Sequence, residues 1–197
     1  MAPSSFRARS PLLLSVDGSS NSSLSTVEHL PTTTEQLICQ WHMVASSSSF
    51  WTAGKHDVSV VYEDNTTTQS KSPPGTLNDI ASYYSGSPPT QQHSTRGISS
   101  PSASASGVYN WRGVGWLRMV TTRWEIVGFG SLLGSNGTDL LVTFAQKTIF
   151  SPQSLSIYCR EKPQVSDDEV IQRVSDVLKQ MGNAALSDEV DRLQAIP

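Results

Sequence analysis

The segment 157–169, with the sequence IYCREKPQVSDDE, decides the fold of this chain. Its first residues complete a short run that begins at Leu155, ends at Arg160 and has the composition of a β-strand. Ser166 and Glu169 then have the spacing of a capping box, which satisfies the first free amides of a helix. The segment therefore predicts a strand followed at once by a helix.

The predicted helix spans residues 166–181 and ends before Gly182, a common C-terminal stop. Its apolar residues recur at spacings of three and four, so one stripe of the helix faces a core. We expect this amphipathic helix to pack on the outside of a sheet. The stripe consists of Val170, Val174, Val177, Leu178 and Met181.

Upstream of this helix, short apolar and β-branched segments alternate with irregular connections, several of which contain glycine or proline. No helical period separates these segments, which predicts an antiparallel meander of strands. The predicted strands lie within 37–45, 57–63, 123–129, 140–145 and 155–160.

Two polar stretches interrupt this pattern. Residues 1–33 are rich in serine and predict a disordered tail, with an organellar transit peptide as a weaker alternative. Residues 64–106 predict a long polar loop segment, broken by one strand at 76–84. The structured domain is therefore expected at 34–197.

The composition limits the classes of function. The chain has 197 residues and a formal net charge of −3, which fits one domain. No block of Lys and Arg marks a phosphate-binding surface, so we expect no nucleic-acid partner. No apolar stretch approaches the roughly 18 residues of a membrane span, and none has the length of a secretory signal core, so we expect a cytoplasmic protein. The oligomeric state stays open.

The order of these elements resembles the lipocalins, in particular their compact bacterial and plant-type branch, and the larger calycin group. The motifs that match are Gln40–Ala45, Lys147–Phe150 and, above all, the segment 157–169. The match spans about residues 34 to 194, with Cys39 where the family's first motif has glycine. The resemblance implies an all-β fold with one C-terminal α-helix, built as an antiparallel up-and-down eight-stranded barrel.

In that family the tryptophan of the first strand lies at the closed end of the barrel, and an arginine from the last strand packs across it. The matching residues here are Trp41 and Arg160. A guanidinium over an indole face contributes about 0.5 to 2 kcal/mol, so we expect this pair to be structural.

Signatures of metal and cofactor chemistry are missing from the sequence. The four His and two Cys are scattered without ligand spacing, so we predict no metal site. Gly113-Val114-Gly115 lies in a β run and opens no helix, so we predict no nucleotide cofactor. Cys39 and Cys159 are expected on adjacent strands, as reduced thiols rather than as a disulfide.

Aromatic residues are the most informative candidates for a ligand site, because a barrel of about eight strands leaves room for one small ligand. Alternation places Trp124, Ile126 and Gly128 on one face of their strand, and Glu125, Val127 and Phe129 on the other, without saying which face is inside. Alternatively, many of these rings merely fill the core. The candidate ligand-binding residues are Tyr62, Tyr109, Trp111, Trp116, Trp124 and Phe144.

Polar side chains on the same segments are candidates for orienting a ligand. Arginines on a barrel strand are more often solvated outside positions, whereas a buried Glu or His would have a pKa suited to acid–base chemistry. The candidates are His42, Tyr62, Glu63, Arg112, Arg118, Arg123 and Glu125.

Three functions follow as hypotheses. The first is binding of a hydrophobic small molecule, a terpenoid, polyketide or fatty-acid-derived compound, in the barrel calyx. The second is a cofactor-independent cyclase or isomerase of specialised metabolism, which acts by holding such a substrate in a reactive shape. The third is a stress or scaffold barrel whose cavity is filled by its own aromatic residues.

Overall fold

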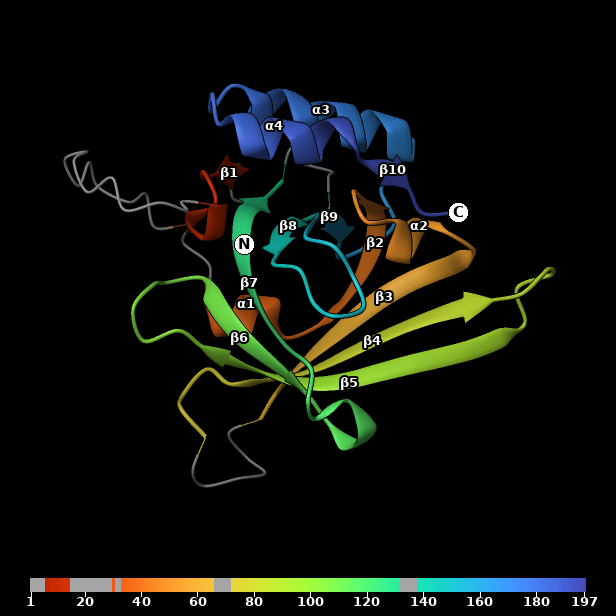
Figure 1. Ribbon diagram of the computed structural model, residues 1–197. Helices are drawn as coiled ribbons and strands as arrows, with labels where there is room; N and C mark the ends of the chain where they lie inside the picture. Colours follow the sequence, from red (N-terminus) through yellow and green to blue (C-terminus); the bar gives the residue numbers. More distant parts are fainter. Residues whose placement is uncertain (1–5, 15–29, 31–32, 66–71, 132–137) are drawn as a thin grey trace.

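The computed structural model describes residues 6–14, 30, 33–65, 72–131 and 138–197. Antiparallel strands dominate, and the two C-terminal helices pack over one side of the sheet (Figure 1). The strands are β1 (Arg7–Ala8), β2 (Gln40–Ser46), β3 (Lys55–Asp64), β4 (Leu77–Ser85), β5 (Gln91–Pro101), β6 (Val108–Gly113), β7 (Thr121–Gly130), β8 (Leu140–Ala145), β9 (Ser154–Cys159) and β10 (Gln194–Ala195). The helices are η1 (Leu12–Leu14), α1 (Thr34–Leu37), α2 (Ser49–Thr52), η2 (Gly115–Leu117), α3 (Asp167–Lys179) and α4 (Ala184–Asp191).

Strands β2 to β9 pair in chain order, and the sheet closes because β9 also pairs with β2. Within the described residues this makes an eight-stranded, antiparallel, up-and-down barrel, as the sequence predicted. Closure leaves no long free edge in the sheet. The short β1 and β10 add to β7 and β2 where these strands extend past their neighbours.

Two apolar clusters divide the core. The cluster inside the barrel is built around Trp41, Trp124 and Tyr158, and the other lies between the barrel wall and the C-terminal helices. Val170, Val174 and Leu178 of α3 are fully buried in this outer cluster. The predicted helix and its docking stripe are therefore present.

The C-terminal region contains a second helix that the sequence analysis did not predict. Ser166 caps α3 by accepting the Glu169 amide, as predicted, and Gly182 takes a left-handed conformation after its end. Asn183 then caps α4, because its side chain accepts the Leu186 amide. Gly182 is thus a turn between two helices rather than the end of helical structure (Figure 1).

The prediction of a long loop at 64–106 is wrong for much of that segment. β4 corresponds to the strand predicted at 76–84, and β5 follows it as the partner in a long hairpin. This hairpin extends beyond the rest of the barrel, as Figure 1 shows. The residues of β5 in its projecting part are polar, so this strand lacks the apolar alternation that normally indicates a strand.

The prediction of a disordered tail at 1–33 is wrong for residues 6–14. β1 pairs with β7, and the buried Arg9 donates to the Ile126 carbonyl at 3.0 Å and pairs with Glu125 at 3.4 Å. The fully buried Glu125 carboxylate also accepts the amides of Leu12 and Leu13, at 3.0 and 2.8 Å. Burial raises the pKa of Glu125, and these donors oppose that shift.

A β-bulge changes which residues of β7 face inward. Between Ile126 and Gly128 the pairing with β8 shifts register. Phe129 therefore joins the interior cluster, 6.2 Å from the Trp41 ring, while Gly128 faces outward. A Cβ on Gly128 would lie 2.6 Å from Phe6, so this glycine makes room for the N-terminal segment. The strict alternation predicted for 124–129 fails at this bulge.

We predict that Glu125→Gln lowers the free energy of unfolding by about 2 kcal/mol, because it leaves Arg9 buried without its charged partner. Urea denaturation measures this change. The matched control is Arg123→Gln, an exposed residue on the same strand, which should stay within about 0.5 kcal/mol of the native chain. Equal stability of both variants would show that the N-terminal segment does not depend on Glu125.

Candidate functional site: the barrel calyx

The barrel encloses a cavity of about 480 Å³, which lies within the usual range for small-molecule sites. Its walls come from the inward faces of strands β2 to β9. Its mouth lies among the loops that join β2 to β3, β6 to β7 and β8 to β9. We call this cavity the calyx.

An aromatic stack forms one wall of the barrel interior. The Tyr62 and Trp124 rings are stacked with their centroids 5.5 Å apart and their planes 15° apart. The Tyr109 ring also stacks on Trp124, with the centroids 4.5 Å apart and the planes 13° apart. These three strands, β3, β7 and β6, thus hold the rings in fixed parallel planes.

The structure brings together most of the predicted ligand-binding residues. Tyr62, Trp111, Trp116 and Trp124 line the calyx, with the largely exposed Trp116 at its mouth. Tyr109 belongs to the interior cluster and stacks behind Trp124 without lining the cavity.

The prediction that Phe144 binds a ligand in the calyx is wrong, because Phe144 does not line this cavity. It belongs to the outer cluster beneath the C-terminal helices. Its register partner on β7 is Glu125, which also faces outward, whereas the neighbouring Thr143 and Ala145 line the cavity. An apolar barrel position can face either core, and the sequence pattern does not distinguish the two.

The calyx contains a carboxyl group, Asp79 of β4, that the sequence analysis did not single out. The Ser99 hydroxyl donates to Asp79 Oδ2 at 3.2 Å, and the Trp124 indole nitrogen donates to the Ser99 oxygen at 2.9 Å. This chain of donors connects the aromatic stack to the carboxyl group. It also fixes the Trp124 ring in its plane.

Burial raises the pKa of Asp79 from its ordinary value of 3.8 to about 7, and the Ser99 hydrogen bond opposes this shift. The phenols of Tyr62 and Tyr158 have raised pKa values, mainly because of burial and also because of the charge on Asp79. Asp79 is therefore the group in the calyx that changes charge near neutral pH.

Sequence reasoning missed Asp79 because it lies in the segment predicted to be mostly loop. The signal was present in the strand predicted at 76–84, where Asp79 alternates with Leu77, Ala81 and Tyr83. An acidic residue on the apolar face of a strand indicates a function when that face is inside. Ser99 and Tyr158 also belong to this site and were not predicted.

The closed end of the barrel has the predicted arrangement of Trp41 and Arg160. The Arg160 guanidinium carbon lies 5.0 Å from the Trp41 ring, and its Nη2 donates to the Gln36 carbonyl at 2.9 Å. Trp41 is fully buried and donates to the Leu37 carbonyl at 3.0 Å. Its contribution to stability stays a prediction.

The two cysteines are free thiols near this closed end. Burial raises the pKa of Cys159 to about 11 and also raises the pKa of Cys39. Both are therefore poor nucleophiles at neutral pH.

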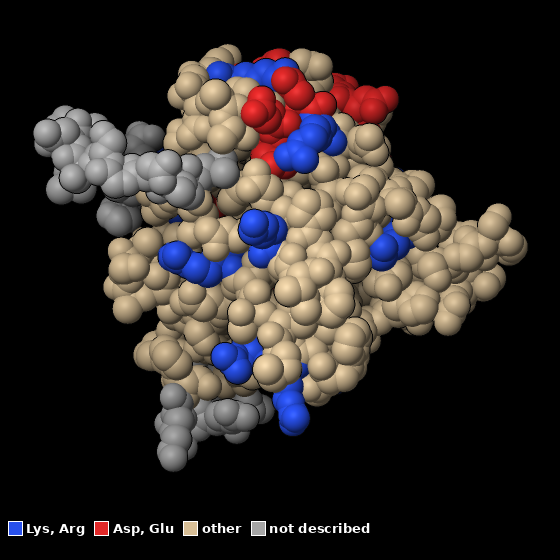
Figure 2. Space-filling model, in the orientation of Figure 1, with Lys and Arg blue, Asp and Glu red and all other residues tan. Residues whose placement is uncertain are grey.

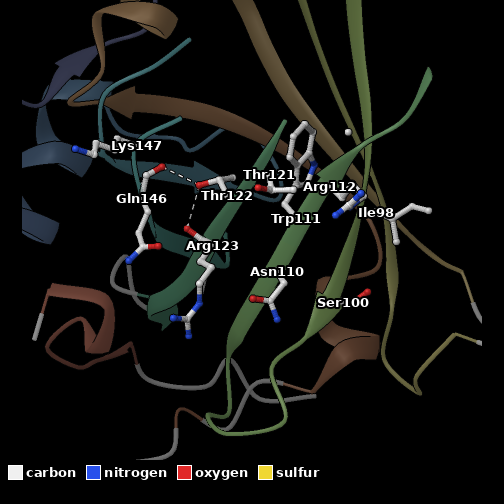
Figure 3. A pocket seen from close by; sticks show the side chains of 11 residues that line it. Ile98, Ser100, Asn110, Trp111, Arg112, Thr121, Thr122, Arg123, Gln146 and Lys147 are labelled. Carbon is white, nitrogen blue, oxygen red and sulfur yellow. Dashed lines mark hydrogen bonds between the residues drawn. The ribbon is translucent and has the colours of Figure 1, made fainter. Parts of the chain in front are cut away.

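The other polar candidates from the sequence point away from the calyx. Arg112 and Arg123, with Lys147, line a groove of about 600 Å³ on the outer side of β5, β6 and β7. Figure 3 shows Asn110 and Arg123 projecting from neighbouring strands, with the Trp111 ring directed away from them. His42, Glu63 and Arg118 are exposed, and Glu125 is buried under the N-terminal segment.

In the part of the chain that the structure describes, no group of three or more His, Cys, Asp and Glu side chains is placed to hold a metal ion. No described helix combines the length and apolar character needed to cross a membrane.

No family model and no curated protein matches this chain. Among solved structures, apocrustacyanin C1 and apocrustacyanin C2 are similar to it, each with a TM-score of 0.49 and 9% identity. In both comparisons the match covers 81% of this chain and 76% of the other.

The closed strand order and the C-terminal helices give the chain a lipocalin-like fold. At the closed end, the Arg160 guanidinium lies over the Trp41 ring, as the resemblance in the sequence implied.

We predict that Asp79→Asn becomes more stable relative to the native chain as the pH rises. The folded-state pKa of Asp79 is about 7 and the ordinary value is 3.8, so the native state holds a proton that the unfolded state releases. Stability is therefore lost as the pH rises from about 4 to about 7, and Asn removes this loss. Between about pH 5 and pH 8 the difference should change by on the order of 2 kcal/mol.

Urea unfolding across this pH range provides the measurement. The exposed Glu63→Gln on β3 is the matched control, and its stability should run parallel to that of the native chain. Parallel curves for Asp79→Asn as well would mean that water in the calyx solvates the carboxylate.

Proposed function

We propose that this protein binds a hydrophobic small molecule in its calyx. The observation that carries the proposal is a cavity of about 480 Å³ inside the barrel, lined in part by stacked aromatic rings and by aliphatic side chains. Such a cavity offers apolar burial to a ligand, while one or two polar groups fix its orientation. Asp79, held by the Ser99 hydroxyl, is the group that would do so.

The ligand class that we propose is a terpenoid, polyketide or fatty-acid-derived compound. The aliphatic side of the calyx, which includes Met43, Val58 and Val60, suits an alicyclic or alkyl body. The flat faces of Tyr62 and Trp111 suit an unsaturated or aromatic part. An unesterified fatty acid fits less well, because its carboxylate would meet Asp79 without a cation beside it.

Catalysis by a cofactor-independent cyclase or isomerase is a second candidate function. Asp79 supports it, because a carboxyl group with a pKa of about 7 donates and accepts protons at neutral pH. A calyx that holds a flexible substrate in a reactive shape lowers the barrier further. The third hypothesis, a barrel filled by its own aromatic side chains, is opposed by the open volume of the calyx.

Native mass spectrometry of protein from its own host, with extraction of bound compounds, tests the proposed function. We expect a stoichiometric apolar metabolite. In addition, the neutral dye N-phenyl-1-naphthylamine should bind the native chain and should bind Ala81→Phe at least about ten-fold more weakly, because Ala81 lines the calyx and the larger ring fills it.

The matched control is Ile80→Phe, which adds a ring on the other face of β4, since Ile80 does not line the cavity. Equal dye affinity in both variants, together with no bound metabolite, would contradict binding in the calyx.

Incubation with the linear precursor of a bound compound distinguishes a carrier from an enzyme. A carrier returns its ligand unchanged, whereas an enzyme forms product, more slowly in Asp79→Asn.

A further inference from the structure

The charge inside the calyx is unbalanced. Among the described residues that line it, Asp79 is the single acidic one, and none is Lys, Arg or His. None of the ion pairs formed by the described residues involves Asp79. The one donor that the described residues give it is the neutral hydroxyl of Ser99, which contacts Oδ2, so Oδ1 is available to a ligand.

Aromatic side chains lie at the cross-strand positions on both sides of this carboxyl group. Tyr62 of β3 is the register partner of Asp79, and its ring is part of the aromatic stack. On the other side, Asp79 pairs with Gly97 of β5. A Cβ at Gly97 would lie 2.1 Å from the Trp111 indole nitrogen, so the missing side chain lets Trp111 lie against this position.

A carboxylate without a counter-ion, placed between aromatic rings, has the features of a site for an organic cation. The negative faces of Tyr and Trp rings attract an ammonium group, by about 2 kcal/mol when it is desolvated. The carboxylate adds a charge-assisted hydrogen bond, which is roughly twice as strong as a neutral one. A cationic ligand also removes the cost of the unpaired charge, which a neutral ligand does not.

We propose that the ligand of the calyx carries a protonated amine on an apolar body, and that Asp79 binds this amine. This inference rests on the proposed function, since it names the ligand class of the same cavity. It extends the terpenoid, polyketide or fatty-acid-derived compounds to those that contain a basic nitrogen.

Binding by this arrangement depends on pH. The titratable groups that face Asp79 from the packed strands are Tyr62 and Tyr158, whose raised pKa values keep them neutral. Lys55 and His93 lie on either side of Tyr83 and do not line the calyx. Amine affinity should therefore follow the ionisation of Asp79, being highest above about pH 8 and falling toward about pH 5.

Isothermal titration of the full chain with two matched probes tests the proposal. The probes are 1-naphthylmethylamine and 1-naphthylmethanol, which share a ring system and differ in one group. At about pH 8 the native chain should bind the amine about ten-fold more tightly than the alcohol. Asp79→Asn should lose this preference and keep its affinity for the alcohol, while the exterior Glu63→Gln should behave like the native chain.

Each result separates this inference from the proposed function. Equal affinity of the native chain for both probes, or an amine preference that survives in Asp79→Asn, overturns the amine site and leaves binding in the calyx intact. Failure of both probes and of N-phenyl-1-naphthylamine to bind overturns the proposed function itself.

A second inference rests on a different observation, the exposed apolar residues at the mouth of the calyx. Trp116 and Met119 of the loop between β6 and β7 are each 82% exposed, and Ile149 and Phe150 of the loop between β8 and β9 are 79% and 57% exposed. Soluble proteins rarely expose neighbouring large apolar side chains without a binding partner. Trp116 and Phe150 both line the calyx, so these two loops meet at its mouth.

The charges around these loops have one sign. Residues 112–123 and 145–153 include Arg112, Arg118, Arg123 and Lys147 and no acidic residue. All four of these cations are exposed, and none forms an ion pair with a described residue. Figure 2 shows the acidic side chains of this face gathered over the C-terminal helices, away from the basic ones on the barrel.

We infer that the mouth of the calyx docks on an anionic lipid surface. Apolar side chains at loop tips insert among the headgroups, and nearby Lys and Arg residues contribute about 1 kcal/mol each on such a surface. Docking in this orientation places the opening of the calyx against the phase in which apolar ligands dissolve.

Co-sedimentation with phosphatidylcholine vesicles, with and without phosphatidylserine, tests this docking. The native chain should bind the anionic vesicles, and binding should weaken about five-fold in Lys147→Gln and at least as much in Trp116→Ser. The matched control, Lys162→Gln, changes an exposed lysine after the closed end of β9 and should bind normally. Absence of binding to both vesicle types, or a mouth that instead joins two chains in gel filtration, overturns the inference.

Discussion

The structure depends first on the closure of the sheet, in which β9 joins β2 and β7 pairs with β6 along its first half and with β8 along most of its length. The bulge between Ile126 and Gly128 shifts the register of β7 against β8 and increases the local twist of the strand. Its consequences reach both cores. Phe129 turns inward onto Trp41, and Gly128 turns outward to leave room for Phe6.

Closure also creates an inside that water reaches only through the mouth, and this sets the chemistry of the calyx. A carboxyl group there loses solvation, which raises the pKa of Asp79 and lowers the stability of the folded chain at neutral pH. Glu125 is fully buried, yet it has Arg9 and two backbone amides as partners. Glu125 is therefore a structural carboxylate, whose partners belong to the chain, whereas Asp79 is available to a ligand.

The two ends of the barrel have opposite character. At the closed end, Arg160 covers Trp41 and is itself held by Gln36 and Asp139. The open end exposes Trp116 and Phe150, which cost solubility unless they meet a partner. Our proposals for the calyx and its mouth both follow from this difference, because a protein that takes up apolar molecules needs one sealed end and one end that approaches their source.

The sequence by itself determined the antiparallel meander, the strand that ends at Arg160 and the helix capped by Ser166, because these depend on local spacing and capping chemistry. It also identified Tyr62, Trp111, Trp116 and Trp124 as candidates. Only the tertiary structure decided that Phe144 faces the outer core, that residues 6–14 pack on β7 and that Asp79 faces the calyx. The physical reason is that a closed barrel with helices on its outside has two cores, and strand alternation separates the faces without showing which core each one meets.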